Sequence, residues 1–256
     1  MARSKTVVFT HGLFVNPVSW NNWKLYFENK GYSCYAPANP YHEGDPAYLR
    51  ENISPNLGKV GFEDVVRNVA KFIETLPEKP IVIGHSLGGL TIMKLVELDK
   101  AVAGISIDGA APKNILPPFQ TVKTMFPVIN FLKGNSVFDT NKRWFHYAFG
   151  NTLSRTKSDQ VFDEIAVPES RNIPRETLYK SFAKVDFSKP HHPLLFIGGE
   201  KDHIIPPALT RKIANAYQDK NSIAEYKIFP GRSHYTCGQE GWHEVADYVL
   251  HWLDRI

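Results

Sequence analysis

A serine between glycines, Gly-His-Ser-Leu-Gly at residues 84–88, has the residue types and spacing of a nucleophile held on a tight turn. A short apolar run at 81–84 leads into Ser86, and a helical pattern over 87–100 follows it. Glycine on either side of the turn lets a strand and a helix pass closely while the hydroxyl stays exposed at the tip. We therefore predict that Ser86 is the nucleophile of a covalent mechanism.

A serine hydroxyl needs a base to remove its proton, and that base needs an acid to orient it. Asp202 lies in "GGEKDHIIPP", directly after an apolar run, and His234 lies in "GRSHY", directly after the last such run. The chain order Ser86, Asp202, His234 is one of the known orders of a Ser-His-Asp triad. These three residues are therefore the predicted catalytic residues, with His234 as base and Asp202 as its orienting acid.

Other titratable residues near these positions have weaker patterns. Asp108 ends the run "ISID" and is the alternative acid, whereas Glu200 lies off the pattern. His85 precedes the nucleophile and is expected to point away from the site and pack. His191 and His192 are adjacent before a predicted strand, and we interpret them as part of a solvated loop. No metal site is predicted from these residues.

The elements that must position the triad alternate between strands and helices. Short runs rich in β-branched and aromatic residues predict six strands, at 5–10, 32–37, 81–84, 102–108, 193–199 and 223–229. Helical patterns fall at 18–31, 61–77, 87–100, 207–218 and 241–256. Strands that are apolar on both faces and alternate with helices indicate a sheet covered on both sides. The predicted fold is α/β, with a doubly wound, mostly parallel, six-stranded sheet.

This alternation stops between about residues 112 and 190, where aromatic and apolar residues cluster without strand character. A structureless loop of that length is implausible in a compact protein, so we predict three or four short helices. The expected division is a core of 1–112 and 191–256 and a helical cap, or lid, of 113–190. Most aromatic residues of the cap are expected to form its core, with one or two lining an acyl pocket: Phe126, Phe131, Trp144, Phe145, Tyr147 and Phe149.

Composition excludes several classes of protein. Of the 256 residues, 43% are apolar and 22% charged, which is ordinary for a globular protein and argues against disorder. Cys34 and Cys237 are the two cysteines, too few for a disulfide framework or a four-cysteine zinc site; Cys237 is a candidate lining residue. The net charge is +4, and residues 113–190 carry 12 Lys or Arg against 7 Asp or Glu. We interpret this excess as a solvated basic surface, and no basic run typical of nucleic-acid binding occurs.

The sequence also bears on membranes and export. No apolar run approaches the roughly 18 to 20 residues needed to span a bilayer. The start, "MARSKTVVFTHG", leaves no room for the apolar core of about 7 to 15 residues that a signal peptide requires. A cytoplasmic protein without a membrane span is therefore expected. The oligomeric state is left open.

Four segments, "THGLF", "GHSLGG", "GGEKDHIIPP" and "GRSHY", give the chain a resemblance to the α/β-hydrolase superfamily over essentially its whole length. It is most similar to bacterial carboxylesterases with a helical cap. It departs from the common pattern at its amino terminus, where the usual first two strands are missing. The resemblance implies an oxyanion hole formed by the backbone amides of Leu13 and Leu87, with Phe14 as the alternative to Leu13. His11 is expected to prop this turn by hydrogen bonding.

The resemblance also implies the chemistry. We expect a serine hydrolase that cleaves small or medium acyl esters through an acyl-enzyme, with a small-molecule ester as partner and no cofactor. Dehalogenases and epoxide hydrolases of the superfamily place aspartate where Ser86 stands. Hydroxynitrile lyases of the plant type have threonine and lysine where this chain has Gly12 and Tyr235. Carbon–carbon bond hydrolases, lactonases, perhydrolases and a catalytically slow ligand receptor remain as alternatives.

Overall fold

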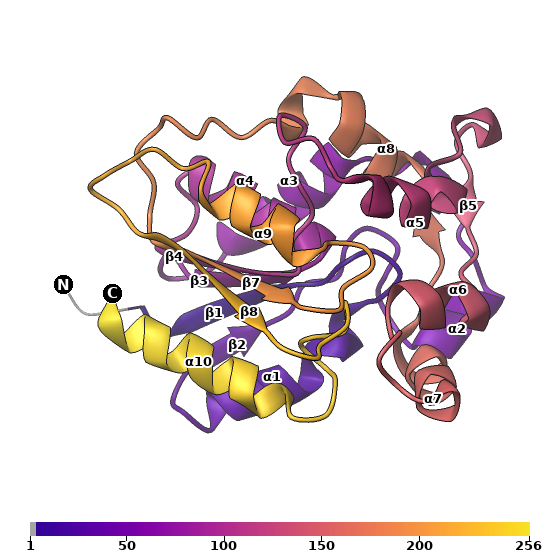
Figure 1. The fold of residues 1–256 in the computed structure, drawn as a ribbon, viewed down its shortest axis with the longest axis horizontal. Helices are drawn as coiled ribbons and strands as arrows, with labels where there is room; N and C mark the ends of the chain where they lie inside the picture. The colour runs from indigo at the N-terminus through magenta and orange to yellow at the C-terminus, as the bar shows by residue number, and fades with distance from the viewer. Residues whose placement is uncertain (1–3) are drawn as a thin grey trace.

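The computed structural model describes residues 4–256, so the first three residues, which belong to the expected core segment 1–112, lie outside it. A six-stranded sheet forms its centre, with the strands in the order β2-β1-β3-β4-β7-β8 and every pairing parallel (Figure 1). The strands are β1 (Thr6–Thr10), β2 (Ser33–Tyr35), β3 (Ile81–His85), β4 (Ala103–Ile107), β7 (Leu194–Gly199) and β8 (Ala224–Phe229). The predicted six-stranded α/β sheet is confirmed.

Successive strand residues point to opposite faces of the sheet, and each face carries its own layer of helices. Val8 belongs to one buried cluster, together with residues of α3 (Phe62–Ile73), α4 (Leu87–Glu97) and α9 (Pro207–Ala214). Its neighbour Val7 belongs to the other, together with residues of α1 (Asn21–Glu28) and α10 (Trp242–Arg255). Apolar side chains on both faces of every central strand thus explain the doubly wound arrangement.

Helix α3 shows how the pattern becomes packing. Its buried residues recur at helical spacing and form one apolar stripe against the sheet: Phe62, Val65, Val66, Val69 and Ile73. Burying each such side chain stabilises the fold by about 1.5–3 kcal/mol. Helix α4 differs, because all ten residues from Leu87 to Val96 are buried. It packs on β3 and β4 and against α3, and its Lys94 donates a 2.9 Å hydrogen bond to the Lys184 carbonyl in the segment that follows β4.

Residues 38–60, for which the sequence predicts no helix or strand, contain regular structure. Helix α2 (Pro46–Glu51) begins after Asp45, whose carboxylate accepts a hydrogen bond from the Tyr48 backbone N–H at 3.0 Å. Aspartate at the N-cap followed by proline at the first helical position is a helix-start signal that the sequence contained. The short 3₁₀ turn η2 (Leu57–Lys59) follows α2, whereas η1 (Pro17–Trp20) directly precedes α1.

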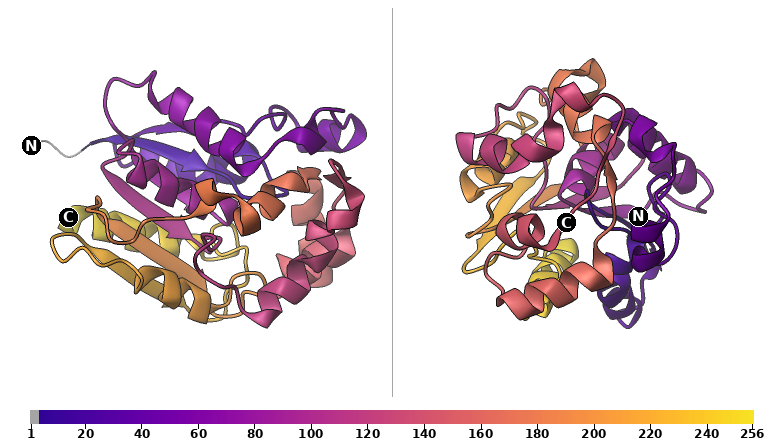
Figure 2. Two further views of the ribbon diagram at one scale, coloured as in Figure 1. Left: turned by 90° about the horizontal axis from the view of Figure 1, so that it is seen from above. Right: turned by 90° about the vertical axis from the view of Figure 1, so that its right-hand side faces the viewer.

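The segment between β4 and β7 packs at one end of the sheet, away from the two termini (Figures 1 and 2). Its helices are α5 (Phe119–Ile129), α6 (Lys142–Ala148), α7 (Arg155–Ile165) and α8 (Asn172–Tyr179), with the turns η3 (Phe131–Lys133) and η4 (Ser181–Ala183). Four α-helices agree with the expected three or four. The expectation of no strands is wrong here, because β5 (Val137–Phe138) and β6 (Glu169–Ser170) pair antiparallel.

Six aromatic residues of this segment were expected mostly in its core, with one or two lining a pocket, and three of the six are buried or half-buried. Phe145 and Phe149 stack with ring centroids 4.6 Å apart inside a cluster from α6 and α7, and Trp144 packs on Phe14 at 4.8 Å. The others, Phe126, Phe131 and Tyr147, are exposed. Helical spacing places residues on one face of a helix without saying what covers that face.

In the described part of the chain, no helix is both long and apolar enough to cross a bilayer.

A buried ion pair ties this segment to the core. His42 Nε2 lies 3.3 Å from a carboxylate oxygen of Glu169 in β6, and both side chains are fully shielded from solvent. Burial is the largest single influence and would lower the pKa of His42, but the charge and hydrogen bonding of Glu169, together with the Pro40 carbonyl and the charge of Glu43, raise the pKa above 6.5. The neighbouring His11 ring lies 5.4 Å away, and its pKa is lowered to about 3 by burial and by His42, so it stays neutral.

This pair predicts a pH dependence of stability. A base whose pKa is raised by folding stabilises the protein fully below pH 6.5, and that contribution is lost as the pH rises through the folded-state pKa. The free energy of unfolding from urea titrations is therefore expected to fall above pH 6.5, by about 1.4 kcal/mol for each unit of pKa elevation. In Glu169→Gln, burial is opposed only by the Pro40 carbonyl and the charge of Glu43, so burial should dominate and the slope should reverse. Glu63→Gln, which removes an exposed pair with Arg67, is the control and should keep the wild-type slope. An unchanged slope in Glu169→Gln would contradict the inference that Glu169 raises the pKa of His42.

Candidate active site

Ser86 follows β3 at the point where the strand order of the sheet changes direction. Strands β1 and β3 are neighbours there, and the chain leaves them toward opposite edges, which opens a crevice at their carboxyl ends. Ser86 has φ 55° and ψ −117°, in a region that non-glycine residues rarely occupy, and α4 begins at the next residue. Such strain is held where the surrounding structure fixes the turn, and it exposes the side chain at the tip.

The flanking glycines are needed for this turn. A Cβ on Gly84 would lie 2.2 Å from the carbonyl oxygen of Gly88, and a Cβ on Gly88 would lie 2.2 Å from that of Thr10. Strand β1, strand β3 and the first turn of α4 therefore approach too closely for any side chain at these two positions. The spacing of the motif is a packing requirement of the turn that presents Ser86.

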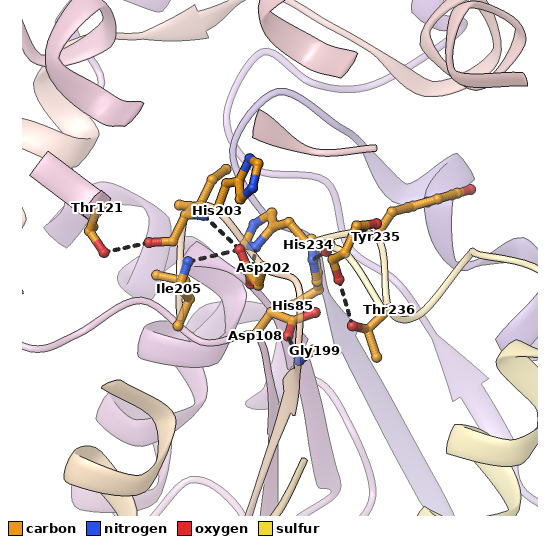
Figure 3. A network of polar contacts seen from close by, with 12 residues as sticks. His85, Asp108, Thr121, Gly199, Asp202, His203, Ile205, His234, Tyr235 and Thr236 are labelled. Atoms are coloured by element: carbon orange, nitrogen blue, oxygen red, sulfur yellow. Dashed lines mark hydrogen bonds and ion pairs between the residues drawn. The ribbon is translucent and has the colours of Figure 1, made fainter. Parts of the chain in front are cut away.

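His234 and Asp202 form a buried pair on the loops after β8 and β7 (Figure 3). His234 Nδ1 lies 2.7 Å from Asp202 Oδ2, and both side chains are shielded from solvent. Asp202 Oδ1 accepts hydrogen bonds from the backbone N–H groups of Ile204, at 2.7 Å, and Ile205, at 2.9 Å. Both carboxylate oxygens are thus engaged, so His234 keeps its proton on Nδ1. Its Nε2 is free to act as a base, since it is buried and has no hydrogen-bond partner among residues 4–256.

His85 joins the serine turn to the histidine loop. Its Nε2 donates a hydrogen bond of 2.8 Å to the backbone carbonyl of His234, and the two rings lie 4.8 Å apart. Burial and the neighbouring His234 lower the pKa of His85 to about 3, so its ring is neutral and Nε2 carries the proton. From its place in the sequence, His85 is expected to point away from the site and pack. It also holds the backbone of His234 against the turn that carries Ser86.

Asp108, the alternative acid, is buried beside the pair of His234 and Asp202, but its hydrogen bond is to a different residue. Its Oδ1 accepts a 2.7 Å hydrogen bond from the Gly199 backbone N–H (Figure 3). Burial first, and the charge of Asp202 second, raise the pKa of Asp108 well above its ordinary value. The raised pKa favours the neutral form of Asp108, whereas the carboxylate oxygen 2.7 Å from His234 Nδ1 belongs to Asp202.

The turn after β1 brings the predicted oxyanion donors toward the serine. Leu13, Ser86 and Leu87 line the same cavity. Leu87 is the first residue of α4, so its N–H has no acceptor within the helix. The side chain of Phe14 lies instead between Trp144 and Phe138, and its carbonyl accepts from the Val167 N–H at 2.8 Å.

His11 supports this turn as expected. Its Nε2 accepts a hydrogen bond from the Asn39 backbone N–H at 3.0 Å, so Nδ1 carries the ring proton and donates to the Gly12 carbonyl at 2.9 Å. The space beside the turn is tight as well. A Cβ on Gly12 would lie 2.8 Å from the Cβ of Ser86. The backbone before Leu13 is therefore fixed from both sides.

A cavity of about 550 Å³ ends at these residues. Its floor consists of Leu13, Ser86 and Leu87, and its walls come from residues 110–132, 174–178 and 204–209. Most of the lining side chains are aliphatic or aromatic, and Lys113 is the one charged residue among them. The Thr121 hydroxyl donates a 2.6 Å hydrogen bond to the Ile204 carbonyl, which ties α5 to the loop of Asp202. The cavity suits an apolar group held over the serine.

The remaining candidates lie away from the cavity lining. His192 pairs with Asp99 at 3.0 Å on an exposed loop, and Glu200 is exposed. Cys237 is buried, and burial raises its thiol pKa, so it is an inert packing residue. Ligand atoms of three buried residues lie within 4.8 Å of one another, as a metal ion would need: His85, Asp108 and His234. In each of these three side chains, however, one polar atom already takes part in a hydrogen bond described above.

Comparison with known families follows this geometry. The profile of the alpha/beta hydrolase family matches residues 7–248, nearly the whole chain. The chain belongs to this family. Its six-stranded sheet and the place of Ser86 after β3 agree with that assignment. Comparison with curated protein sequences finds no significant match.

Solved structures share the fold at low sequence identity. A monoacylglycerol lipase of Paleococcus ferrophilus is 19% identical, with a TM-score of 0.70, and the match covers 99% of this chain and 96% of that one. An extracellular alpha/beta-hydrolase of a Paenibacillus species is 19% identical, with a TM-score of 0.72 and coverage of 96% and 98%. A pyrethroid hydrolase of Sphingobium faniae is 17% identical, with a TM-score of 0.67 and coverage of 97% of each chain. At these identities the likeness concerns the fold.

Proposed function

We propose that this protein is a serine esterase that cleaves carboxylic esters with an uncharged acyl group. The observation that carries the proposal is the apolar cavity with Ser86 at its floor and the buried His234–Asp202 pair beside the serine turn. Similar structures named as a lipase and a pyrethroid hydrolase are compatible with it. Residues 113–190 act in this proposal as a cap that supplies most of the cavity wall.

The mechanism assigns one role to each residue. His234 Nε2 takes the proton of Ser86, and the serine oxygen attacks the acyl carbonyl to form a tetrahedral oxyanion. The backbone N–H groups of Leu13 and Leu87 bind that oxyanion, an interaction whose loss typically costs about 3–4 kcal/mol. Asp202 keeps the proton of His234 on Nδ1 and stabilises the imidazolium. His234 then protonates the leaving alcohol, and a water activated by the same nitrogen releases the acid and restores Ser86.

The proposal is tested with p-nitrophenyl esters from acetate to dodecanoate and with a fluorophosphonate probe. We expect hydrolysis with a maximum at a medium chain length, because the cavity is apolar and about 550 Å³ in volume. Mass spectrometry should find the phosphonate on the peptide that contains Ser86. Absence of both hydrolysis and adduct contradicts the proposal. Saturable binding of the esters without release of product would instead support a ligand receptor.

A further inference from the structure

An exposed apolar surface surrounds the mouth of the cavity. It is formed by eight residues from the segment before α5, from α5 and η3, and from the end of α8: Leu116, Phe119, Val122, Phe126, Phe131, Leu132, Leu178 and Tyr179, together called the mouth patch. Leu132 is 97% exposed, Phe119 80% and Phe126 71%. Large apolar side chains gathered in this way on one surface mark a contact with a partner or a lipid phase.

The mouth patch continues into the cavity. Six of its members also line the cavity that ends at Ser86: Leu116, Val122, Phe126, Phe131, Leu132 and Leu178. An acyl chain can therefore pass from an apolar phase outside the protein to the serine without crossing a polar surface. A cavity for water-dissolved substrates has no need of an exposed apolar rim.

Hydrogen bonds hold this surface in place. The guanidinium of Arg175 in α8 is 5% exposed, and it donates to the backbone carbonyls of Ile129, at 2.6 Å, Asn130 and Gly134. These carbonyls end α5 and flank η3, where a helix leaves its last carbonyl groups without partners. The arginine thus fixes α5, η3 and α8 to one another, and Figure 1 shows α5 and α8 together at the upper right. The apolar side chains stay exposed on an ordered scaffold.

The charges around the mouth patch are mostly positive, and the one acidic residue in these segments, Glu176, lies 3.8 Å from the ammonium group of Lys180. Residues 113–133 contain three lysines and no acidic residue, and residues 171–180 contain two arginines, one lysine and one glutamate. Lys123 follows Phe119 by four positions and precedes Phe126 by three, so it lies on the same exposed face of α5. Lys133 directly follows Leu132, and Lys180 directly follows Tyr179. The apolar side chains are therefore accompanied by exposed ammonium groups.

We propose that the mouth patch docks the protein on an anionic lipid surface, with its apolar side chains among the acyl chains and its lysines at the headgroups. Apolar burial combined with about 1 kcal/mol per basic residue near an anionic surface gives binding at an interface without a membrane span. A second copy of this chain fits less well, because two such basic faces repel each other. The catalytic consequence, that the ester is drawn directly from the lipid phase, rests on the proposed esterase function.

Binding is measured by sedimentation of Ser86→Ala protein with phosphatidylcholine vesicles that contain either no phosphatidylglycerol or 30 mol% of it. The Ser86→Ala background keeps the lipid intact during the measurement. We expect binding to the anionic vesicles, weakened by salt, and little binding to the neutral ones. Replacing Lys123, Lys133 and Lys180 together by glutamine should weaken binding about 100-fold. The matched control replaces three exposed lysines elsewhere by glutamine, Lys71, Lys157 and Lys220, and should bind like the parent.

A second pair of variants tests the apolar part. Phe119→Ser should weaken binding to anionic vesicles at least tenfold, whereas Leu25→Ser, at a 61% exposed position on α1, should leave it unchanged. Equal binding to neutral and anionic vesicles, or equal losses in the mouth and control variants, overturns the proposal. Dimerisation abolished by Phe119→Ser would also overturn it in favour of a second copy.

The esterase function is tested separately on the same variants. With Ser86 intact, the lysine and Phe119 variants should hydrolyse dissolved p-nitrophenyl butyrate at the wild-type rate, because none of these residues lines the cavity. Vesicle binding without any ester hydrolysis would refute the esterase and leave the docking surface supported. Hydrolysis of the dissolved ester without vesicle binding would overturn the docking surface alone.

Discussion

Ser86→Ala is expected to lower kcat on p-nitrophenyl butyrate by about 10⁴- to 10⁶-fold while the protein stays folded. Alanine removes the oxygen that forms the acyl-enzyme, and it keeps the Cβ that lies beside the turn after β1. The Leu13 and Leu87 amides and the cavity stay in place, so the remaining rate should exceed that of the reaction in water. Initial rates and thermal unfolding of the same preparations measure both parts of the prediction.

Ser106→Ala is the matched control for this prediction. Ser106 is buried in β4 as the cross-strand partner of Gly84, one strand away from the serine turn. The same chemical change there should leave kcat within about threefold of wild type, because Ser106 is not among the residues that line the cavity and its hydroxyl has no hydrogen-bond partner among residues 4–256. A Ser86→Ala variant that is folded and as active as wild type contradicts the role of Ser86 as nucleophile.

The sequence was sufficient for the sheet, and it predicted a common region for the candidate site residues, because the signals are local. Each strand is a short apolar run, and each site residue directly follows one of these runs. In a parallel sheet all such positions come to the same edge, so Ser86, Asp202 and His234 could be assigned to one region without knowledge of the strand order. The turn glycines at 84 and 88 carried further information, since no side chain fits at either position.

Features that depend on distant contacts could not be predicted in this way. The pair of His42 and Glu169 joins residues 127 positions apart, and nothing near either one in sequence marks a buried ion pair. The short strands β5 and β6 exist through their pairing, because neither has more than two residues. The contacts of Arg175 could not be predicted for the same reason, because its hydrogen-bond partners are carbonyl groups about 45 positions away in the sequence.

The exposed aromatic residues show a different limit. Phe126 and Phe131 were expected in the interior of the cap or in an acyl pocket, because apolar residues at helical spacing usually face a core. The structure places both at the mouth of the cavity, where they line it and are also exposed to solvent. The periodicity of apolar residues defines one face of a helix. Whether protein, substrate or lipid covers that face depends on the tertiary arrangement, which the periodicity does not contain.

Asp202→Asn is expected to lower kcat by about 10⁴-fold, or about 5.4 kcal/mol in the barrier, whereas Asp108→Asn should stay within about threefold of wild type. The N–H groups of Ile204 and Ile205 require an acceptor, so the amide oxygen of the new side chain takes the place of Asp202 Oδ1. The amide NH₂ group then faces His234 Nδ1, which must become the acceptor. The ring proton moves to Nε2, and the base can no longer take the proton of Ser86.

Asp108→Asn should be tolerated because burial already favours the neutral form of Asp108. Its oxygen accepts from the Gly199 N–H, which an amide oxygen does equally well. Since burial raises the pKa of Asp108, its ionisation in the unfolded chain makes the wild type lose stability as the pH rises above 3.8. The variant lacks that loss, so urea titrations should find it more stable relative to wild type at pH 8 than at pH 4. A 10⁴-fold loss of kcat in Asp108→Asn together with an active Asp202→Asn would show that Asp108 is the acid of the triad, despite the 2.7 Å contact between His234 and Asp202.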